Sequence, residues 1–503
     1  MKTKIILGPP GTGKTHNLLS LVEQELANGT PPDRIAFVAF TKKAATEARD
    51  RATKKFNLEE QHLPYFRTLH SFAFHQLGLT KSEVMSRDNY KEFGYAFGMD
   101  LGSVSDGVDA GGVFTVDNQL LAEVNLARMK CMNLEQHYNE TNLDVSWHAL
   151  LRAQRAIEEF KKKKEVLDFT DMIEMYVESG MVPKLDIVFV DEAQDLCALQ
   201  WRMVHKICQN AKQVYISGDD DQAIYRWAGA DVEHLIGLPG ERKILQQSYR
   251  CSSLIQNCSQ SIIGRVKNRI HKTWHGTENK GLVQYHSYPD SVNVQEKNGD
   301  ENWLIMARTN YLLDEIERDI RLQGLFYKRN NRLPISQKLL SATAAWKKLH
   351  ENKSVELSDV KNIYSYMSSE IGIERGHKNL KTANRETYEL DDLITDHGLI
   401  VHNRPWDVAF DKVGTRDKEF LRSIETRNRD FTKKEPNIHL STIHGAKGGE
   451  ADKVMLLTDL SRKSQEAMEK NSDDECRVFY VAATRARNEL HIVQPQRDGG
   501  FII

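Results

Sequence analysis

Residues 7–15 read L-G-P-P-G-T-G-K-T, between a short apolar run at 5–7 and a segment of helical character at 16–26. They fit the pattern G-x-x-x-x-G-K-[ST], with Gly8, Gly13, Lys14 and Thr15 at its defined positions. Glycines let backbone N–H groups surround a polyphosphate, and the helix that follows adds a favourable dipole. Lys14 can reach the β- and γ-phosphates, and the Thr15 hydroxyl can bind Mg²⁺. The alternative is a glycine-rich turn that fits by chance, but the order of strand, loop and helix favours a nucleoside triphosphate site.

The rest of the chain alternates short apolar runs with helical or turn-rich segments. One set of runs lies at 5–7, 35–40, 187–190 and 214–217, and a second set lies at 282–285, 303–306, 454–458 and 490–493. This alternation predicts an α/β fold with two parallel sheets, helices on their faces and chemistry at the carboxyl ends of the strands. Two polar, helix-rich stretches interrupt the pattern and are interpreted as helical insertions. The predicted division is 1–71 with 166–240 for the first domain, 72–165 for its insertion, 241–322 with 435–503 for the second domain, and 323–434 for its insertion.

Composition restricts the class of protein. The 503 residues are 40% hydrophobic, which suits a globular protein of several domains, and no run of 18 apolar residues predicts a transmembrane helix. The six cysteines form no C-x-x-C pair, which argues against zinc or iron–sulfur sites and for reduced thiols. No targeting signal is evident, so a cytoplasmic protein without a membrane partner is expected, in a bacterial, phage or other nucleoid-associated setting.

Charge alone does not predict the partner. The formal net charge is -2, whereas a nucleic-acid-binding protein is often basic. Local basic clusters remain, above all the four lysines at 161–164. Such a run is more often a solvated helix face than a binding patch, so both interpretations stay open.

A second chemical motif follows the apolar run 187–190, where Asp191 and Glu192 stand at the expected strand end. A carboxylate there is where a P-loop enzyme needs its other magnesium-side ligand. The next carboxylate, Glu192, can act as general base toward the attacking water. The alternative is that the two acids only cap a helix, and the upstream P-loop favours catalysis over that.

The run 214–217 leads into a polar loop that ends in Gln222. An uncharged amide at this place can bond both the γ-phosphate and the attacking water, so Gln222 is a candidate phosphate sensor. Tyr225 and Trp227 flank Arg226 shortly afterwards. Exposed aromatics beside a cation suit stacking on unpaired bases, although Trp227 could instead belong to the core.

Taken in order, these motifs resemble those of superfamily 1 DNA helicases of the UvrD/Rep/PcrA type. The matching boxes are 8–15 (motif I), 37–45 (Ia), 67–71 (Ib), 167–171 (the box before II), 191–195 (II), 218–230 (III), 246–250 (IV), 307–310 (IVa), 441–450 (V) and 480–486 (VI). They cover almost the whole chain in the order of the family, and both insertions lie where the family carries extra subdomains. The resemblance implies two RecA-like domains, each with a mainly helical insertion.

The resemblance also assigns roles at the nucleotide. Gly8, Pro9, Gly11, Thr12, Gly13, Lys14 and Thr15 would bind ATP, with Thr15 and Asp191 on Mg²⁺. Glu192 would be the base and Gln222 the γ-phosphate sensor. Arg250 and Arg485 would approach the γ-phosphate from the second α/β domain. Tyr249 would stack on the nucleotide base and Glu450 would contact the ribose.

On the DNA side, the resemblance implies contacts from both domains. The candidates are Phe40, Thr41, His70, Tyr225, Trp227, Arg308, Thr442 and His444. The implied activity is ATP-dependent translocation on single-stranded DNA and unwinding of duplex in the 3′-to-5′ direction. Implied partners are single-stranded DNA, junctions of single and double strand, and single-strand-binding, replication or recombination proteins.

An alternative of another class needs the same ATPase residues. It is a DNA-stimulated ATPase that senses or remodels nucleoprotein without unwinding, as a subunit of a larger assembly. A signalling GTPase is disfavoured because no N-K-x-D box is present. Departures from the family pattern are Ala228, where relatives often carry a basic residue, and Gly449 and Ala451 in motif V. No glutamine segment precedes Gly8, which leaves the choice of adenine open.

Overall fold

The computed structural model describes residues 2–102, 118–141, 143–295, 301–380, 385–427, 435–497 and 499–503. These residues form two compact units. The first comprises Met1–Lys280 and Met468–Thr484, and the second comprises Gly281–Ala467 and Arg485–Ile503. Each unit is built around a six-stranded sheet in which every pairing is parallel, which confirms the predicted α/β class with two parallel-sheet domains.

The first sheet has its chemistry-bearing loops at the carboxyl ends of its strands. The strands in spatial order are β3 (Phe66–Thr68), β2 (Ile35–Ala39), β4 (Ile187–Val190), β5 (Gln213–Gly218), β1 (Lys2–Leu7) and β6 (Glu241–Ile244). The associated helices are α1 (Lys14–Ala27), α2 (Lys42–Phe56), α3 (Leu69–Gln76), α8 (Phe169–Ser179), α9 (Ala198–Cys208), α10 (Val232–Gly237), α11 (Ser253–Ile263) and α19 (Ser472–Ala483).

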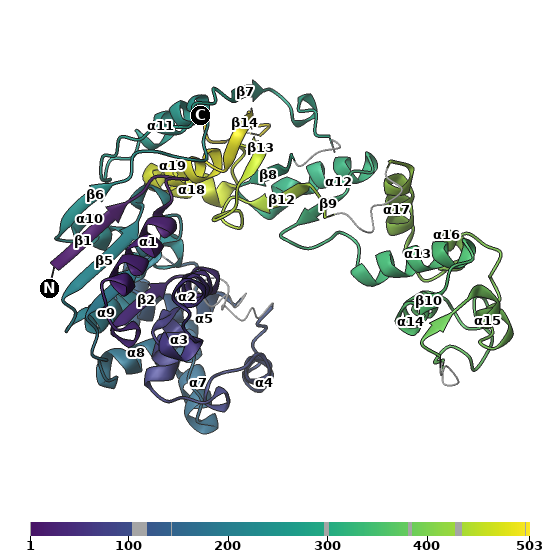
Figure 1. Cartoon of the computed structure of the whole chain (residues 1–503), viewed down its shortest axis with the longest axis horizontal. Helices are drawn as coiled ribbons and strands as arrows, with labels where there is room; N and C mark the ends of the chain where they lie inside the picture. The colour runs from purple at the N-terminus through teal and green to yellow at the C-terminus, as the bar shows by residue number, and fades with distance from the viewer. Residues whose placement is uncertain are drawn as a thin grey trace. The chain divides into compact units, whose positions relative to one another are not determined.

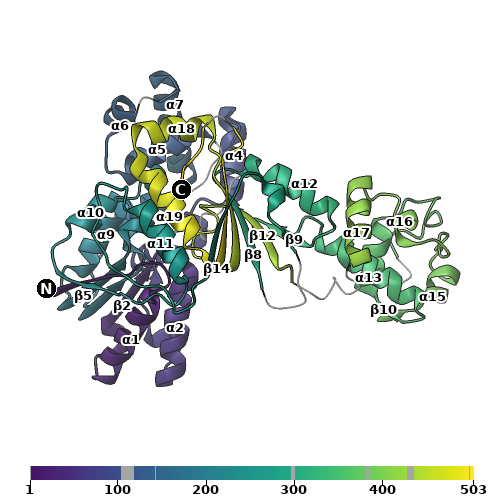
Figure 2. The same ribbon diagram turned by 90° about the horizontal axis from the view of Figure 1, so that it is seen from above.

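Alternate side chains of each strand point to opposite faces of this sheet, and helices bury both faces. On one face Ile6 and Phe37 pack with side chains of α1 and α2, and on the other Ile5 and Val38 pack with those of α3, α8 and α9. Figure 2 shows α1 and α2 on one side of the sheet and α9 and α10 on the other. A strand buried on both faces reads as a continuous apolar run, as β4 does.

The first sheet extends beyond the boundary that we predicted at residue 240. β6 pairs with β1 through Lys4↔Glu241 to Leu7↔Ile244, so it is the edge strand of the first sheet. Helix α11 and the later helix α19 also belong to the first unit. The sequence E-R-K-I of β6 is mostly exposed and lacks the apolar signal of a buried strand. Charged residues of this kind are common on edge strands, where one side is open to solvent.

The helices inserted in the first unit are α4 (Arg87–Phe97), α5 (Gln119–Met129), α6 (Leu134–Thr141) and α7 (Trp147–Lys164). They have a core of their own, in which Phe93 and Phe160 meet edge to face at 5.5 Å. Arg128 of α5 and Lys161 of α7 both bind Asp168 and Asp171 at the start of α8. Lys161 is thus a nearly buried ion-pair partner, rather than part of a solvated face.

The second sheet resembles the first in architecture. Its strands in spatial order are β7 (Leu282–His286), β14 (Ala486–Val493), β13 (Ala451–Leu457), β8 (Trp303–Ala307), β12 (Ile438–Thr442) and β9 (Tyr327–Arg329). Helix α12 (Asp314–Leu322) lies between β8 and β9 in sequence, and α18 (Arg462–Lys470) crosses the division between the units.

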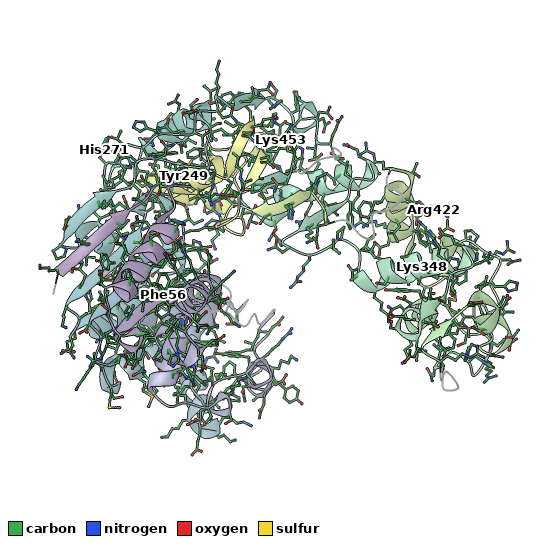
Figure 3. The ribbon with its side chains drawn as sticks, in the orientation of Figure 1. Phe56, Tyr249, His271, Lys348, Arg422 and Lys453 are labelled. Carbon is green, nitrogen blue, oxygen red and sulfur yellow. The ribbon has the colours of Figure 1, made fainter. Side chains whose placement is uncertain are left out.

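The inserted segment of the second unit is mainly helical. It contains α13 (Gln337–His350), α14 (Leu357–Ser365), α15 (Leu390–Thr395), α16 (Trp406–Ala409), α17 (Thr415–Arg427) and a short antiparallel pair, β10 (Val355–Glu356) and β11 (Thr387–Tyr388). Figure 1 shows α13 to α16 gathered around β10, and Figure 3 marks Lys348 on α13 and Arg422 on α17. None of the helices in the described ranges combines the length and the hydropathy needed to cross a bilayer.

Candidate functional site

The loop between β1 and α1 has the backbone of a phosphate cradle. Gly11 and Gly13 both have φ of 73°, in the left-handed region that favours glycine. A Cβ atom on Gly8 would lie 2.2 Å from Lys14 Cγ, so that position has no room for a side chain. Lys14 Nζ donates to Gly8 O over 2.7 Å, and Thr12 Oγ1 donates to Pro9 O over 2.8 Å. The lysine amine is thus folded over the loop that would receive phosphate.

Two oxygen ligands suited to Mg²⁺ meet beside this loop. Thr15 Oγ1 donates to Asp191 Oδ2 over 2.8 Å, and Asp191 is 1% exposed. Burial, together with the charge of Glu192, raises the pKa of Asp191 to about 7. Among the described residues no cluster of three or more His, Cys, Asp or Glu could hold a metal by itself. A hydroxyl and one carboxylate fit an ion that takes its other ligands from the phosphates of a nucleotide.

A series of hydrogen bonds joins the side chain of Glu192 to that of Gln222. Glu192 has the left-handed φ of 53°, and its Oε2 accepts from Gln194 Nε2 over 2.5 Å. Gln194 Oε1 accepts from the Asp219 backbone N–H over 2.9 Å, and Asp219 Oδ2 accepts from Gln222 Nε2 over 2.7 Å. The candidate base and the candidate sensor are therefore held by one network. Neither Gln194 nor Asp219 was identified from the sequence, since their role depends on β4 and β5 being neighbours.

The segment after β6 lies directly against the phosphate loop. Ser248 Oγ donates to Pro10 O over 2.7 Å, and the Tyr249 backbone N–H donates to Gly11 O over 2.8 Å. A Cβ atom on Gly11 would lie 2.4 Å from Arg250 Cβ. We predicted that Arg250 approaches from the second α/β domain, but it belongs to the same compact unit as the loop. The hydrogen bonds from Ser248 and Tyr249 hold this segment against the phosphate loop, and the sequence pattern does not reveal them.

A pocket of about 620 Å³ opens next to the loop and could receive the base of a nucleotide. Its lining residues are Gly11, Thr12, Gly13, His16, Asn17, Leu245, Gln246, Gln247 and Tyr249. The Tyr249 side chain, labelled in Figure 3, is 77% exposed and is thus accessible for stacking.

The two other nucleotide candidates lie in the second unit. Arg485 is 2% exposed and donates to Gly449 O over 3.1 Å. Glu450 forms an ion pair with Arg487. Glu450 immediately precedes β13 and Arg485 immediately precedes β14, so both lie where a strand of the second sheet begins.

The DNA candidates of the first unit differ in accessibility. Trp227 is 59% exposed, which rules out the alternative that it is a core residue. Tyr225 is half-buried and stacks on Phe40 with ring centroids 6.3 Å apart. Phe40 itself is only 8% exposed, so its ring supports Tyr225. Thr41 caps α2 by accepting from the Ala44 N–H.

His70 lies in a setting that keeps it neutral. Its ring meets the Phe169 ring edge to face at 5.7 Å. Burial lowers the pKa of His70 to about 4, against a smaller opposing effect of Asp168. At neutral pH this side chain can offer hydrogen bonds or ring contacts to a nucleic acid, but no positive charge.

The DNA candidates of the second unit gather at the carboxyl end of its sheet. β8 and β12 are neighbours with Thr442 paired to Ala307, so Arg308 and Thr442 leave adjacent strands at the same edge. The Ile443 N–H donates to Ala307 O over 3.0 Å, which keeps the turn that carries His444 against the end of β8.

The chain matches the models of two helicase domains. Residues 1–241 match the UvrD/REP helicase N-terminal domain, and residues 311–497 match the UvrD-like helicase C-terminal domain. A probable DNA helicase II homolog of Mycoplasma pneumoniae is 22% identical over 99% of this chain and 83% of its own length. One from Rickettsia conorii is 24% identical over 98% of this chain and 90% of its own. The ATP-dependent DNA helicase Rep of a Buchnera aphidicola strain is 23% identical over 76% of this chain and 60% of its own.

Proposed function

The chain belongs to the UvrD/Rep helicase family, and from this we propose that it is an ATP-dependent translocase on single-stranded DNA that unwinds duplex in the 3′-to-5′ direction. ATP with Mg²⁺ is the proposed fuel. Hydrolysis in the first RecA-like domain would be coupled to movement of the two RecA-like domains along the strand. The site residues keep the roles that the sequence predicts, except that Phe40 supports Tyr225 and Arg250 acts from within the unit that holds the phosphate loop.

One observation supports the coupling most directly. The short segment that follows β5 carries both Gln222, which is bonded into the nucleotide network through Asp219, and the exposed Trp227. A change at the γ-phosphate that moves Gln222 would therefore be transmitted along a few residues to an aromatic ring suited to stacking on a base. Base stacking needs no particular sequence, so binding of single strands should be independent of sequence and sensitive to salt.

The names of the relatives support the choice of fuel and substrate. Among them are an ATP-dependent DNA helicase Rep and an ATP-dependent DNA helicase PcrA. Because the formal net charge of the chain is -2, contacts with DNA are expected to be local, which fits candidates confined to the carboxyl ends of the two sheets.

Steady-state ATP hydrolysis with and without single-stranded DNA tests the first half of the proposal, with single-stranded RNA as the comparison. We expect strong stimulation by DNA. A rate that is indifferent to nucleic acid would contradict the assignment of the DNA-facing residues.

Unwinding of duplexes with a 3′ or a 5′ single-stranded tail tests the second half. Release of the strand only from the 3′-tailed substrate is expected. Release only from the 5′-tailed substrate would overturn the direction. DNA-stimulated hydrolysis without any release would replace the helicase by an ATPase that remodels nucleoprotein.

A further inference from the structure

Three consecutive aspartates are buried in the loop that follows β5. Asp219, Asp220 and Asp221 are 0%, 0% and 1% exposed. A buried carboxylate is strongly unfavourable unless it is paired and hydrogen-bonded. The structure meets this requirement with Lys272 and Arg269, which lie about 50 residues further along the chain.

Lys272 is the centre of this arrangement. Its Nζ lies 3.2 Å from Asp219 Oδ1, 2.5 Å from Asp220 Oδ1 and 3.0 Å from Asp221 Oδ2, and its side chain is 0% exposed. Burial by itself would lower the pKa of Lys272, but the three carboxylates outweigh burial and raise it. The lysine is therefore charged, and one ammonium group contacts every acid of the loop.

Two arginines bind the same loop. Arg269 forms a bidentate pair with Asp221 at 2.7 and 2.5 Å. Arg477, on α19, donates from Nε to Asp220 O over 3.0 Å and from Nη2 to Asn268 O over 2.6 Å. Arg269 thus pairs with a carboxylate of the loop, Arg477 holds the loop's backbone, and the loop is fixed to the 268–272 segment and to α19 within one unit.

Asp219 connects this cluster to the nucleotide site. One of its carboxylate oxygens contacts Lys272, and the other accepts from the Gln222 side-chain amide over 2.7 Å. The orientation of the Gln222 amide consequently depends on a carboxylate that Lys272 holds in place. A hydrogen bond of this kind must be set to within a fraction of an ångström for a sensor to meet a phosphate oxygen.

We propose that Lys272 is a positioning residue for ATP hydrolysis, which acts through Asp219 to hold the Gln222 amide toward the γ-phosphate. The proposal rests on the function proposed above. Lys272 touches neither nucleotide nor DNA in this role. Arg477 serves the same loop from α19, the helix that ends shortly before Arg485.

Removal of Lys272 alone would take away the cation that contacts the buried carboxylates of Asp219 and Asp220 and could unfold the domain. The variant for the test is therefore Lys272→Met combined with Asp220→Asn, which removes one charge of each sign and leaves Asp221 paired with Arg269. Replacing a buried ion pair by neutral groups of similar size is often nearly neutral for stability. We expect the melting temperature and the affinity for ATP to stay close to wild type, while kcat falls by about 10- to 100-fold. Lys212→Met, which removes the lysine of an exposed pair with Asp186, is the matched control and should leave kcat unchanged.

A thermodynamic cycle with Gln222→Ala separates positioning from a general effect on the fold. If Lys272 acts through Gln222, adding Lys272→Met and Asp220→Asn to Gln222→Ala lowers kcat no further than Gln222→Ala alone. Multiplied losses would overturn the proposal, as would wild-type kcat in the folded double variant.

Asp219→Ala keeps the experiment decisive if the Lys272 variant does not fold, because Lys272 then retains Asp220 and Asp221. It should reproduce the loss of kcat and should also show no further loss in the Gln222→Ala background. Wild-type turnover in Asp219→Ala would overturn the proposal. A wild-type protein without ATPase activity would instead contradict the proposed function itself, so the two failures are distinguishable.

Discussion

Thr15 Oγ1 donates a hydrogen bond to Asp191 Oδ2 over 2.8 Å, although 176 residues separate the two in the chain. The contact forms because β1 and β4 both flank β5 in one parallel sheet, so that their carboxyl ends lie at one edge. It places a hydroxyl oxygen and a carboxylate oxygen side by side, where both could bind one Mg²⁺ ion.

The first prediction concerns that pair of oxygens. Thr15→Ala should raise the Mg²⁺ concentration needed for half-maximal ATP hydrolysis by about 10- to 100-fold, because one oxygen ligand is lost. Thr15→Ser keeps the hydroxyl and should stay close to wild type. Magnesium titrations of the ATPase rate compare the three proteins. Equal requirements in wild type and Thr15→Ala would remove Thr15 from the metal site.

Glu192→Gln should separate binding from turnover. The amide keeps the size of the side chain but cannot accept a proton, so kcat should fall by about 10²- to 10⁴-fold while ATP affinity changes little. Equilibrium binding of ATP and single-turnover hydrolysis measure the two quantities. Asp195→Asn is a useful comparison because Asp195 also accepts from the Gln194 amide but lies one step away from the base. A normal rate in Glu192→Gln would exclude it as the base.

How much of the fold can be predicted from the sequence depends on whether each element has a local sequence pattern. The phosphate loop is contiguous, and buried strands such as β4 are apolar throughout, so both can be recognised from the local sequence. β6 cannot be recognised in this way, because an edge strand with Glu241, Arg242 and Lys243 resembles a polar loop in sequence. The first sheet therefore extends past the predicted boundary.

The site was predictable in its residues but not in its connections. Lys14, Asp191 and Gln222 stand at fixed places in local motifs. Lys272 has no motif around it, and its contacts to Asp219 arise only from the tertiary fold. The sequence does contain one indication of such contacts, because three adjacent aspartates follow a buried strand and buried carboxylates require cationic partners. Which cations meet them depends on packing.

Trp227→Ala should weaken single-strand binding by about 1–3 kcal/mol if the ring stacks on a base. The exposed position of Trp227 means that the change should leave the melting temperature near wild type. Tyr95→Ala, in the helical insertion and 93% exposed, controls for the loss of an exposed aromatic. Fluorescence anisotropy with a labelled oligonucleotide gives the affinities. Unchanged binding in Trp227→Ala would exclude the ring from the DNA surface.

Arg128 should be essential for joining the inserted helices to α8. Its guanidinium binds Asp168 at 2.8 Å, Asp171 at 2.5 Å and Glu174 at 2.6 Å. Arg128→Met should lower the free energy of unfolding by about 3 kcal/mol, because partly buried carboxylates lose their partner.

Arg128→Lys supplies the matched control for this cluster. It keeps the charge but loses the fork that reaches several acids, so its stability should be intermediate. Urea unfolding measures all three proteins. If Arg128→Met is as stable as wild type, Lys161 alone is sufficient to hold Asp168 and Asp171.

The half-buried setting of His70 predicts a defined dependence of stability on pH. The folded protein holds this imidazole neutral down to a pKa of about 4, whereas the ordinary value is 6.5. Between those values the unfolded chain binds the proton and the folded chain does not, so acid favours unfolding. The contribution of His70 to stability is complete above about pH 6.5 and is lost as the pH falls toward about 4.

His70→Gln should therefore show a shallower decline of stability between pH 6.5 and about 4, by up to about 1.4 kcal/mol per pH unit. His271→Gln, at an exposed position marked in Figure 3, is the control for the loss of one histidine. Urea unfolding at a series of pH values gives the slopes, and identical slopes for wild type and His70→Gln would show that the imidazole is protonated in the folded protein as readily as in the unfolded chain.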